Sequence, residues 1–283
     1  MWHGGWCWRY LTPRLREAGH DVYTPALTGL GERLHLNHDD IDLNTHIRDI
    51  VNLIEFEELR DVILVGHSFG GTLAPAIAEQ VPDRVARLVN IDGPLPVHGL
   101  CLKDLIGDTW DFFLAHAVDP GDAGRIQPIA DWTFGVSAAD LDWLRARLTP
   151  QPLKTLTTPL TLVNPLAQAI PRLFISCIEE PSEEETARQA SYYQHQGWDF
   201  RWLPTGHDAM ITMAEVAGYR PVTVVATSIR ASARKINQMP IVAEITGNVT
   251  SVASRPTTPT TRAMIQVIIL GALSFMTSSS FKQ

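Results

Sequence analysis

Residues 63–74 read ILVGHSFGGTLA, and this stretch decides the fold. The run 61–65 is apolar after one acidic residue, which is typical of a parallel strand buried on both faces. Gly66, Ser68 and Gly70 follow in the spacing G-x-S-x-G, and residues 72–80 are a helix candidate. A strand that turns sharply into a helix holds the central serine out at the edge of a sheet. The stretch therefore predicts a nucleophile elbow with Ser68 at its tip, and a glycine-rich turn that contains serine by chance is the alternative.

The rest of the chain alternates between strand and helix patterns. Further strand candidates are 20–25, 86–91, 172–178 and 200–203, and helix candidates are 6–18, 43–56 and 183–195. This alternation predicts an α/β fold with a mostly parallel sheet and helices on both faces. Residues 93–165 are less regular, with several Pro, Gly and Trp residues, and we interpret them as an inserted cap.

Composition and charge divide the chain into two parts. The 283 residues carry a net charge of −8 and are 45% hydrophobic, as in an ordinary globular protein without the basic patch of a nucleic-acid binder. Residues 220–283, however, contain seven Lys or Arg residues, one acid, and neither Trp nor His. We therefore predict a globular domain over 1–218 and a basic, Ser/Thr-rich tail over 219–283, which is a candidate disordered segment.

The cysteines, the N-terminal residues and the apolar segments indicate in which cellular compartment the protein is expected. The three cysteines, Cys7, Cys101 and Cys177, form no disulfide or metal-binding pattern and are expected to be buried free thiols. The N-terminal residues lack the pattern of a signal peptide, which favours a cytoplasmic protein. The apolar run 264–276 is too short and interrupted for a membrane span, so no membrane association is expected. The oligomeric state does not follow from the sequence.

A nucleophilic serine needs an oriented base. His207 lies in the segment PTGHDAM, just after the last strand candidate, where the histidine of a Ser–acid–His order belongs. The other histidines considered are interpreted as solvated surface residues, namely His35, His38, His46 and His195. His67 flanks the serine and is expected to shape the elbow.

The acid and the oxyanion donor follow from the same architecture. The loop after the strand 172–178 reads EEPSEEET, and within it Glu180 is the predicted acid and Glu179 the alternative. The remaining glutamates suit the start of a helix, where negative charge is favourable. The backbone N–H of Phe69, directly after the serine, is the predicted oxyanion donor.

Four segments together resemble a known family. They are HGGWCWRYLTPRLREAGHDVYTPALTGLGERLHL, DVILVGHSFGGT, WLRARLTPQPL and LPTGHDAM. They resemble small bacterial esterases of the α/β-hydrolase fold that are related to plant hydroxynitrile lyases and plant methyl-ester esterases. The resemblance implies hydrolysis of a small carboxylic ester through an acyl-serine, with Ser68 as nucleophile, His207 as base and a small cap. It implies no metal or organic cofactor.

Two departures from the family concern the residues around His207. The family usually has aspartate as the acid, whereas the matching loop here offers glutamates. Hydroxynitrile lyases of this family have lysine directly after the histidine, where this chain has Asp208, so esterase is favoured over lyase. A lyase or C–C bond hydrolase on the same scaffold is kept as an alternative.

The third departure is a missing strand. Relatives have an apolar strand ending in His-Gly before the segment that matches residues 1–5, and it lies beside the serine strand in mid-sheet. The second oxyanion donor would then be the backbone nitrogen of Met1 or Trp2. A truncated, weakly active or non-catalytic family member is therefore a further alternative. We hypothesise that one of two apolar runs in the tail, 222–229 or 264–276, fills the vacant position, because unpaired strands are costly.

Overall fold

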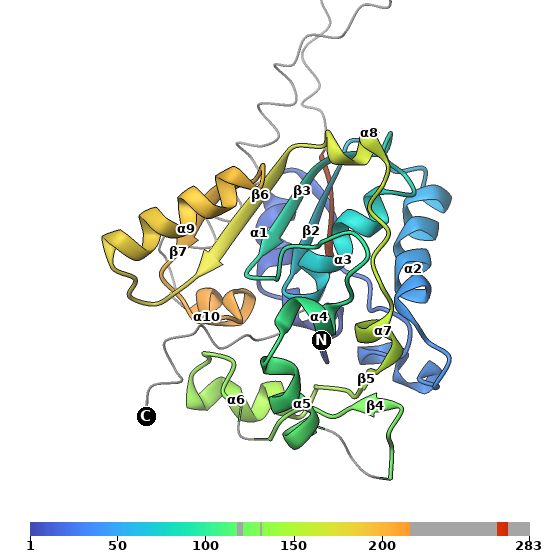
Figure 1. The fold of residues 1–283 in the computed structure, drawn as a ribbon, viewed down its shortest axis with the longest axis vertical. Coiled ribbons are helices and arrows are strands. Elements are labelled where there is room, and N and C mark those ends of the chain that lie inside the picture. Colours follow the sequence, from blue (N-terminus) through green and yellow to red (C-terminus); the bar gives the residue numbers. More distant parts are fainter. Residues whose placement is uncertain (118–120, 131, 216–264, 271–283) are drawn as a thin grey trace, which may run out of the picture.

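A computed structural model describes residues 1–117, 121–130, 132–215 and 265–270. Its centre is a six-stranded sheet in the order β1-β8-β2-β3-β6-β7, and every neighbouring pair in this sheet is parallel (Figure 1). The strands are β1 (His20–Tyr23), β2 (Val62–His67), β3 (Val85–Ile91), β6 (Arg172–Cys177), β7 (Asp199–Leu203) and β8 (Ile265–Leu270). The predicted α/β fold with a mostly parallel sheet is confirmed.

Helices lie on both faces of the sheet: α3 is in front of it in Figure 1 and α1 behind it. The helices outside the cap are η1 (Gly5–Trp8), α1 (Leu11–Glu17), η2 (Gly31–Leu36), α2 (Leu43–Phe56), α3 (Phe69–Ala78), α8 (Pro165–Gln168), α9 (Glu183–His195) and α10 (Ala209–Glu215). Helix α3 packs on β2 and β3, and α2 packs on α3. None of the described helices is long and apolar enough to cross a membrane.

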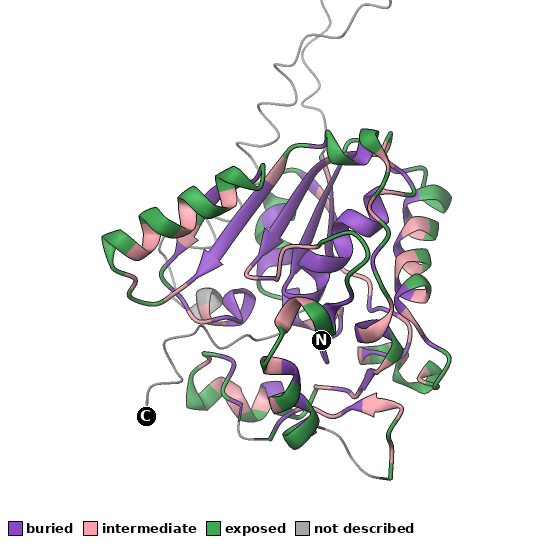
Figure 2. Ribbon diagram, in the orientation of Figure 1, coloured by how far each residue is buried: buried purple, intermediate pink, exposed green. Residues whose placement is uncertain are grey.

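The core sits between the sheet and these helices, as Figure 2 shows. All six residues of β2 and all ten residues of α3 are buried, which explains why their composition, His67 apart, is apolar or small. Helix α2 is two-sided instead: Ile50 and Ile54 are fully buried, whereas Phe56 at its end is 85% exposed. Its N-cap is Asp42, whose carboxylate accepts a hydrogen bond from the Thr45 backbone N–H.

Strand β8 comes from the far end of the chain and lies in the middle of the sheet. It pairs with β1 on one side, where Ile268 lies opposite Tyr23, and with β2 on the other, where Ile268 lies opposite Leu64. Residues 267–270 are fully buried. The hypothesis that the run 264–276 fills the vacant position beside the serine strand is confirmed for these residues. The other candidate run, 222–229, and the rest of the predicted tail lie outside the described residues.

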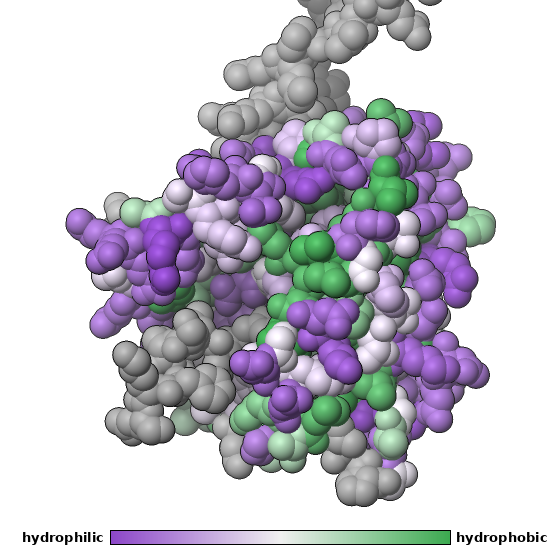
Figure 3. Space-filling view, viewed as in Figure 1, coloured by the Kyte–Doolittle hydropathy of each residue, from purple (hydrophilic) through white to green (hydrophobic). Residues whose placement is uncertain are grey.

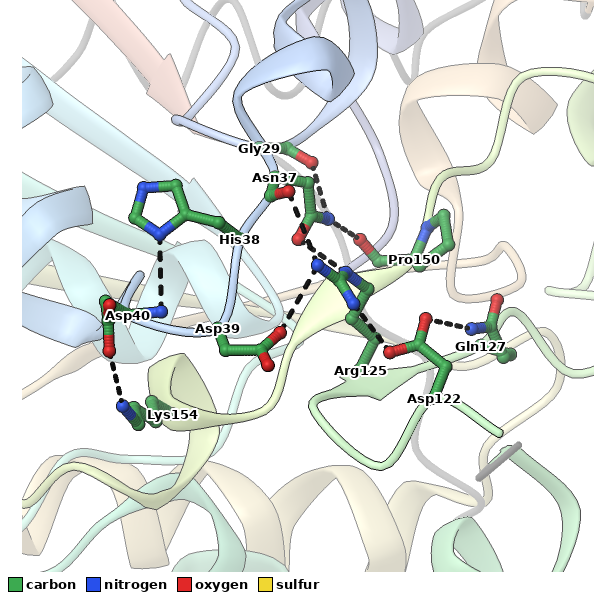
Figure 4. A network of polar contacts seen from close by, with 10 residues as sticks. All are labelled: Gly29, Asn37, His38, Asp39, Asp40, Asp122, Arg125, Gln127, Pro150 and Lys154. Atoms are coloured by element: carbon green, nitrogen blue, oxygen red, sulfur yellow. Dashed lines mark hydrogen bonds and ion pairs between the residues drawn. The ribbon is translucent and has the colours of Figure 1, made fainter. Parts of the chain in front are cut away.

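The cap covers the carboxyl ends of the strands (Figure 1). Its elements are α4 (Leu102–Ile106), α5 (Thr109–Ala117), β4 (Arg125–Ile126), α6 (Ala138–Arg145), β5 (Gln151–Pro152) and α7 (Lys154–Thr157), with β4 and β5 paired antiparallel. A polar network fastens it to the loop after β1 (Figure 4). Arg125 Nε donates to Asn37 Oδ1 at 2.9 Å, Asn37 Nδ2 donates to the carbonyl of Pro150 at 2.9 Å, and Lys154 pairs with Asp40 at 3.0 Å.

The surface is unevenly apolar. On the face shown in Figure 3, apolar atoms gather in a band down the middle, and polar atoms cover the two flanks. The more exposed large apolar side chains of the connections around the cap are Val97, Leu100, Val163 and Leu166. All three cysteines are buried and free, as expected.

His46 differs from the expectation of a surface histidine. It lies in α2 with no exposed surface, its Nε2–H donates to the carbonyl of Thr28 at 3.0 Å, and its ring meets Phe69 edge-on. The burial of His46 could not be predicted from its position in the sequence, because it results from the loop before α2 folding back over the helix. Burial lowers the pKa of His46 to about 4 from the usual 6.5, and the nearby carboxylate of Asp49 opposes this shift.

The depressed pKa of His46 makes stability pH-dependent. The unfolded chain takes up a proton at this histidine as pH falls through 6.5, and the folded chain does so only near pH 4. His46 therefore contributes stability that is fully present above pH 6.5 and is lost as pH falls toward 4. We expect the free energy of unfolding to fall by about 2 kcal/mol more in the native protein than in His46→Gln between neutral pH and about pH 5.

Urea unfolding at the two pH values measures this difference. The glutamine of His46→Gln would keep an N–H donor for Thr28 without titrating in this range. His35→Gln, at an exposed position, serves as the matched control and should behave like the native protein. Equal pH dependence of the native protein and His46→Gln would contradict the expectation.

Candidate active site

Ser68 lies between β2 and α3 in a backbone conformation that few side chains adopt. Its φ and ψ are 56° and −117°, and it is the N-cap of α3. The turn is tight because a Cβ at Gly66 would lie 2.0 Å from the carbonyl oxygen of Gly70, so only glycine fits there. The backbone N–H of Ser68 donates to the carbonyl of Ile91 in β3 at 2.8 Å. The geometry is that of the predicted nucleophile elbow.

His207 lies in the loop between β7 and α10 and is brought beside the elbow. His67 Nε2 lies 2.8 Å from the carbonyl oxygen of His207, and the two imidazole rings are 4.5 Å apart. Because a carbonyl only accepts, His67 carries its proton on Nε2. Burial, followed by the nearby charges of His207 and His3, lowers the pKa of His67 well below 6.5, so its ring is neutral. His67 thus holds the backbone of His207. That it also shapes the elbow stays a prediction.

The carboxylate that pairs with His207 is Asp92. His207 Nδ1 and Asp92 Oδ2 are 2.6 Å apart, with the two side chains 6% and 21% exposed. The other carboxylate oxygen, Oδ1, accepts the backbone N–H of Cys177 at 3.0 Å. Asp92 directly follows β3, and its φ of 52° turns the chain sharply at the carboxyl end of that strand. The residue is therefore held from two sides and faces the imidazole.

The prediction of Glu180, with Glu179 as its alternative, does not agree with this geometry. Both glutamates are exposed in the turn after β6. The acid was expected after β6, but β3 is the strand directly beside β2, so its carboxyl end lies closer to the elbow. The signal that could have found Asp92 is a single acid immediately after a buried parallel strand, in the segment LVNIDGP.

The predicted oxyanion donors lie in different surroundings. Phe69 is the first residue of α3 and 2% exposed, and an N–H at this position has no partner within its helix. Trp2 N–H, in contrast, donates to Gln151 Oε1 at 3.2 Å, so it is already used. Met1 is 2% exposed, and burial lowers the pKa of its amino group to about 4 against the opposing effect of Asp208. Its role as a donor stays a prediction.

Aromatic side chains enclose the N-terminal residues beneath the cap. Trp2 is fully buried, its Nε1–H donates to the carbonyl of Ile126 at 3.0 Å, and its ring lies 6.1 Å from that of Trp132. Phe113 and Phe134 complete this cluster. Of the tryptophans in the cap, Trp110 and Trp132 are buried. Their surroundings are those of core packing.

The side-chain atoms of the candidate nucleophile and of the candidate base have no hydrogen-bond partner among the described residues. They are Ser68 Oγ and His207 Nε2, and both residues are buried. A nucleophile and its base often complete their hydrogen bond only when substrate is bound. His67, His207 and Asp208 also bring potential metal-ligand atoms within 4.8 Å of one another. This group contains the candidate base itself and is not a separate centre.

Comparisons with known proteins indicate one family of proteins. The family model described as "Alpha/beta hydrolase family" matches residues 1–219. The carbendazim hydrolyzing esterase of a Nocardioides species is 38% identical over 221 residues, which cover 75% of this chain and 91% of that protein. Methylesterase 18 of Arabidopsis thaliana is 24% identical over 75% of this chain and 81% of that protein.

Solved structures show the same fold. An extracellular α/β-hydrolase from a Paenibacillus species, described as sharing homology with tobacco salicylic acid binding protein 2, superposes with a TM-score of 0.66. It is 23% identical in sequence, and the match covers 82% of this chain and 95% of that one. The overall fold of the present chain is therefore one found in solved proteins.

Proposed function

The chain belongs to the alpha/beta hydrolase family and has esterase-type relatives. From this premise we propose that it is a serine hydrolase that cleaves small carboxylic esters through an acyl-serine. The observation that carries the proposal is the pairing of His207 Nδ1 with Asp92 at 2.6 Å beside an elbow that holds Ser68. It leaves His207 Nε2 without a partner among the described residues, as a base for serine requires.

The proposed reaction assigns a role to each residue. Ser68 Oγ attacks the ester carbonyl as His207 Nε2 takes its proton, and Asp92 keeps the other ring nitrogen protonated and stabilises the imidazolium. The backbone N–H of Phe69 donates to the oxyanion, with the positive end of α3 behind it. His207 then protonates the leaving alcohol. Water, deprotonated by His207 Nε2, attacks the acyl-serine, and the imidazolium returns the proton to Ser68 Oγ as the carboxylic acid is released. No step in this scheme uses a metal or organic cofactor.

Covalent labelling tests the proposal. We expect the native protein to take up one fluorophosphonate per chain, read by intact mass, and Ser68→Ala to take up none. The reason is that only an oriented and activated serine reacts with this reagent at a useful rate. A folded native protein that stays unlabelled would contradict the assignment and would favour the non-catalytic alternative.

Substrate profiling separates ester hydrolysis from the lyase alternative. Nitrophenyl esters of short acids should be hydrolysed, and cyanohydrins should not be cleaved, because Asp208 stands where a lyase of this scaffold has lysine. Carbendazim belongs in the panel because the relative that is 38% identical is named for hydrolysing it. Faster release of cyanide than of nitrophenol would overturn the ester assignment in favour of a lyase.

A further inference from the structure

A second imidazole–carboxylate pair lies directly behind His207. His3 Nε2 and Asp208 Oδ2 are 3.2 Å apart, and neither side chain has any exposed surface. Asp208 follows His207 in the chain, whereas His3 comes from the N-terminal segment. The proposed reaction assigns no role to either residue. A buried pair of ionisable groups is costly to keep unless its protons and partners are well arranged.

The hydrogen bonds of this pair determine its proton count. His3 Nδ1 lies 2.8 Å from the carbonyl oxygen of Met1, and since a carbonyl only accepts, Nδ1 carries a proton. His3 Nε2 faces the carboxylate, so one further proton lies between the two groups. It belongs either to an imidazolium that faces a carboxylate or to a carboxylic acid that faces a neutral imidazole. The pair has no net charge in either form.

The loop that carries His207 is held against the cap, close to this pair. The backbone N–H of Asp208 donates to the carbonyl of Phe134 in the cap at 3.1 Å. The ring of His3 stacks on Trp6 and meets Phe134 edge-on. On the other side of the loop, a Cβ at Gly206 would lie 2.5 Å from the carbonyl oxygen of Gly135. His207 is thus fixed by its neighbours on both sides, and His3 contacts both Asp208 and the ring of Phe134.

Several ionisable groups in the described core carry no charge near neutral pH. Burial lowers the pKa of the Met1 amino group and of His67, and burial raises the pKa of the thiols of Cys7 and Cys177. All four groups are therefore uncharged near neutral pH. Asp92 contacts the ring of His207 directly, and Asp208 of the His3–Asp208 pair brings a carboxylate oxygen within 4.8 Å of a ring nitrogen of His207.

We propose that His3 and Asp208 are positioning residues. They hold the loop that carries His207, and as a neutral pair they place no net charge on the buried side of its imidazole. This inference rests on the proposed function, because it concerns the same base. Loss of His3 would leave the carboxylate of Asp208 unpaired beside His207. That negative charge would favour the protonated imidazole, which cannot accept the proton of Ser68. Loss of both groups would remove the unbalanced charge.

Three variants test this arrangement on the full chain, with a nitrophenyl ester as substrate. His3→Asn keeps an N–H donor for the Met1 carbonyl but has nothing at the place of Nε2. We expect it to lower kcat roughly 10-fold to 100-fold with little change in KM, because a misplaced base slows the reaction more than it weakens binding. We also expect the acid limb of its pH profile to move up by about one unit.

In the double variant His3→Asn, Asp208→Asn, the acid limb should return to its native position and kcat should rise above that of His3→Asn. Asp208→Asn alone should leave the acid limb in place. His195→Asn is the matched control, because His195 Nδ1 also contacts a backbone carbonyl, that of Ser191, but on an exposed helix. It should match the native protein in kcat and in pH profile.

The outcomes separate this inference from the proposed function. If His3→Asn folds and keeps native kcat and an unshifted acid limb, the inference is overturned while fluorophosphonate labelling of native Ser68 still supports the hydrolase. If the double variant is no better than His3→Asn, the charge argument is also overturned. If His3→Asn does not fold, His3→Gln takes its place, since it can still donate to Asp208 but lacks the charge. The acid limb of the pH profile of His3→Gln should then move to higher pH, and an unshifted acid limb overturns the inference.

Discussion

Replacing Asp92 by Asn is expected to lower kcat for a small ester by about 10⁴-fold with little loss of stability, as loss of the orienting carboxylate does in serine proteases. The side-chain oxygen of the introduced asparagine can still accept the N–H of Cys177. Its amide nitrogen then faces His207 Nδ1, which must become an acceptor. The ring proton moves to Nε2, and the imidazole can no longer take the proton of Ser68.

Steady-state hydrolysis of a nitrophenyl ester measures this loss, and thermal unfolding checks that the variant is folded. Glu180→Gln is the matched control, because it removes a carboxylate from the exposed turn where the acid was expected. It should keep native kcat. A large loss in Glu180→Gln together with a small one in Asp92→Asn would contradict the assignment of Asp92.

Replacing Ile268 by Asp is expected to abolish both cooperative folding and fluorophosphonate labelling. Ile268 is fully buried in β8 between Tyr23 of β1 and Leu64 of β2. An unpaired carboxylate there, with the loss of a buried aliphatic side chain, costs about 4 kcal/mol or more. Typical domains are stable by only roughly 5–15 kcal/mol. Because β2 carries Ser68, disruption of β8 reaches the elbow directly.

Urea unfolding followed by circular dichroism measures the effect on the whole chain. Phe56→Asp offers the same change in chemistry at a side chain that is 85% exposed, and it should stay within about 0.5 kcal/mol of the native protein. An Ile268→Asp protein with native stability would mean that β8 does not pair with β1 and β2 in solution. The hydrolase fold would then have to tolerate a gap between β1 and β2.

The elbow could be predicted because its determinants are local. Gly66, Ser68 and Gly70 are close in sequence, and the conformation they require depends on side-chain size at those positions. The same holds for His207, which follows a short strand in a turn. The acid was harder to predict because carboxylates follow more than one strand. The choice between Asp92 and Glu180 depends on the order of the strands in the sheet. The local sequence around each residue does not reveal that order.

The sequence by itself therefore determined the class of fold and indicated Ser68 and His207 as candidates, because periodicity and turn chemistry act over a few residues. Tertiary structure decided three matters that depend on residues far apart in the chain. It brought Asp92 to His207, it placed His3 against Asp208, and it seated β8 between β1 and β2. Each of these contacts joins segments between about one hundred and more than two hundred residues apart. These contacts depend on how the strands are ordered and packed in the whole sheet, which local sequence patterns do not encode.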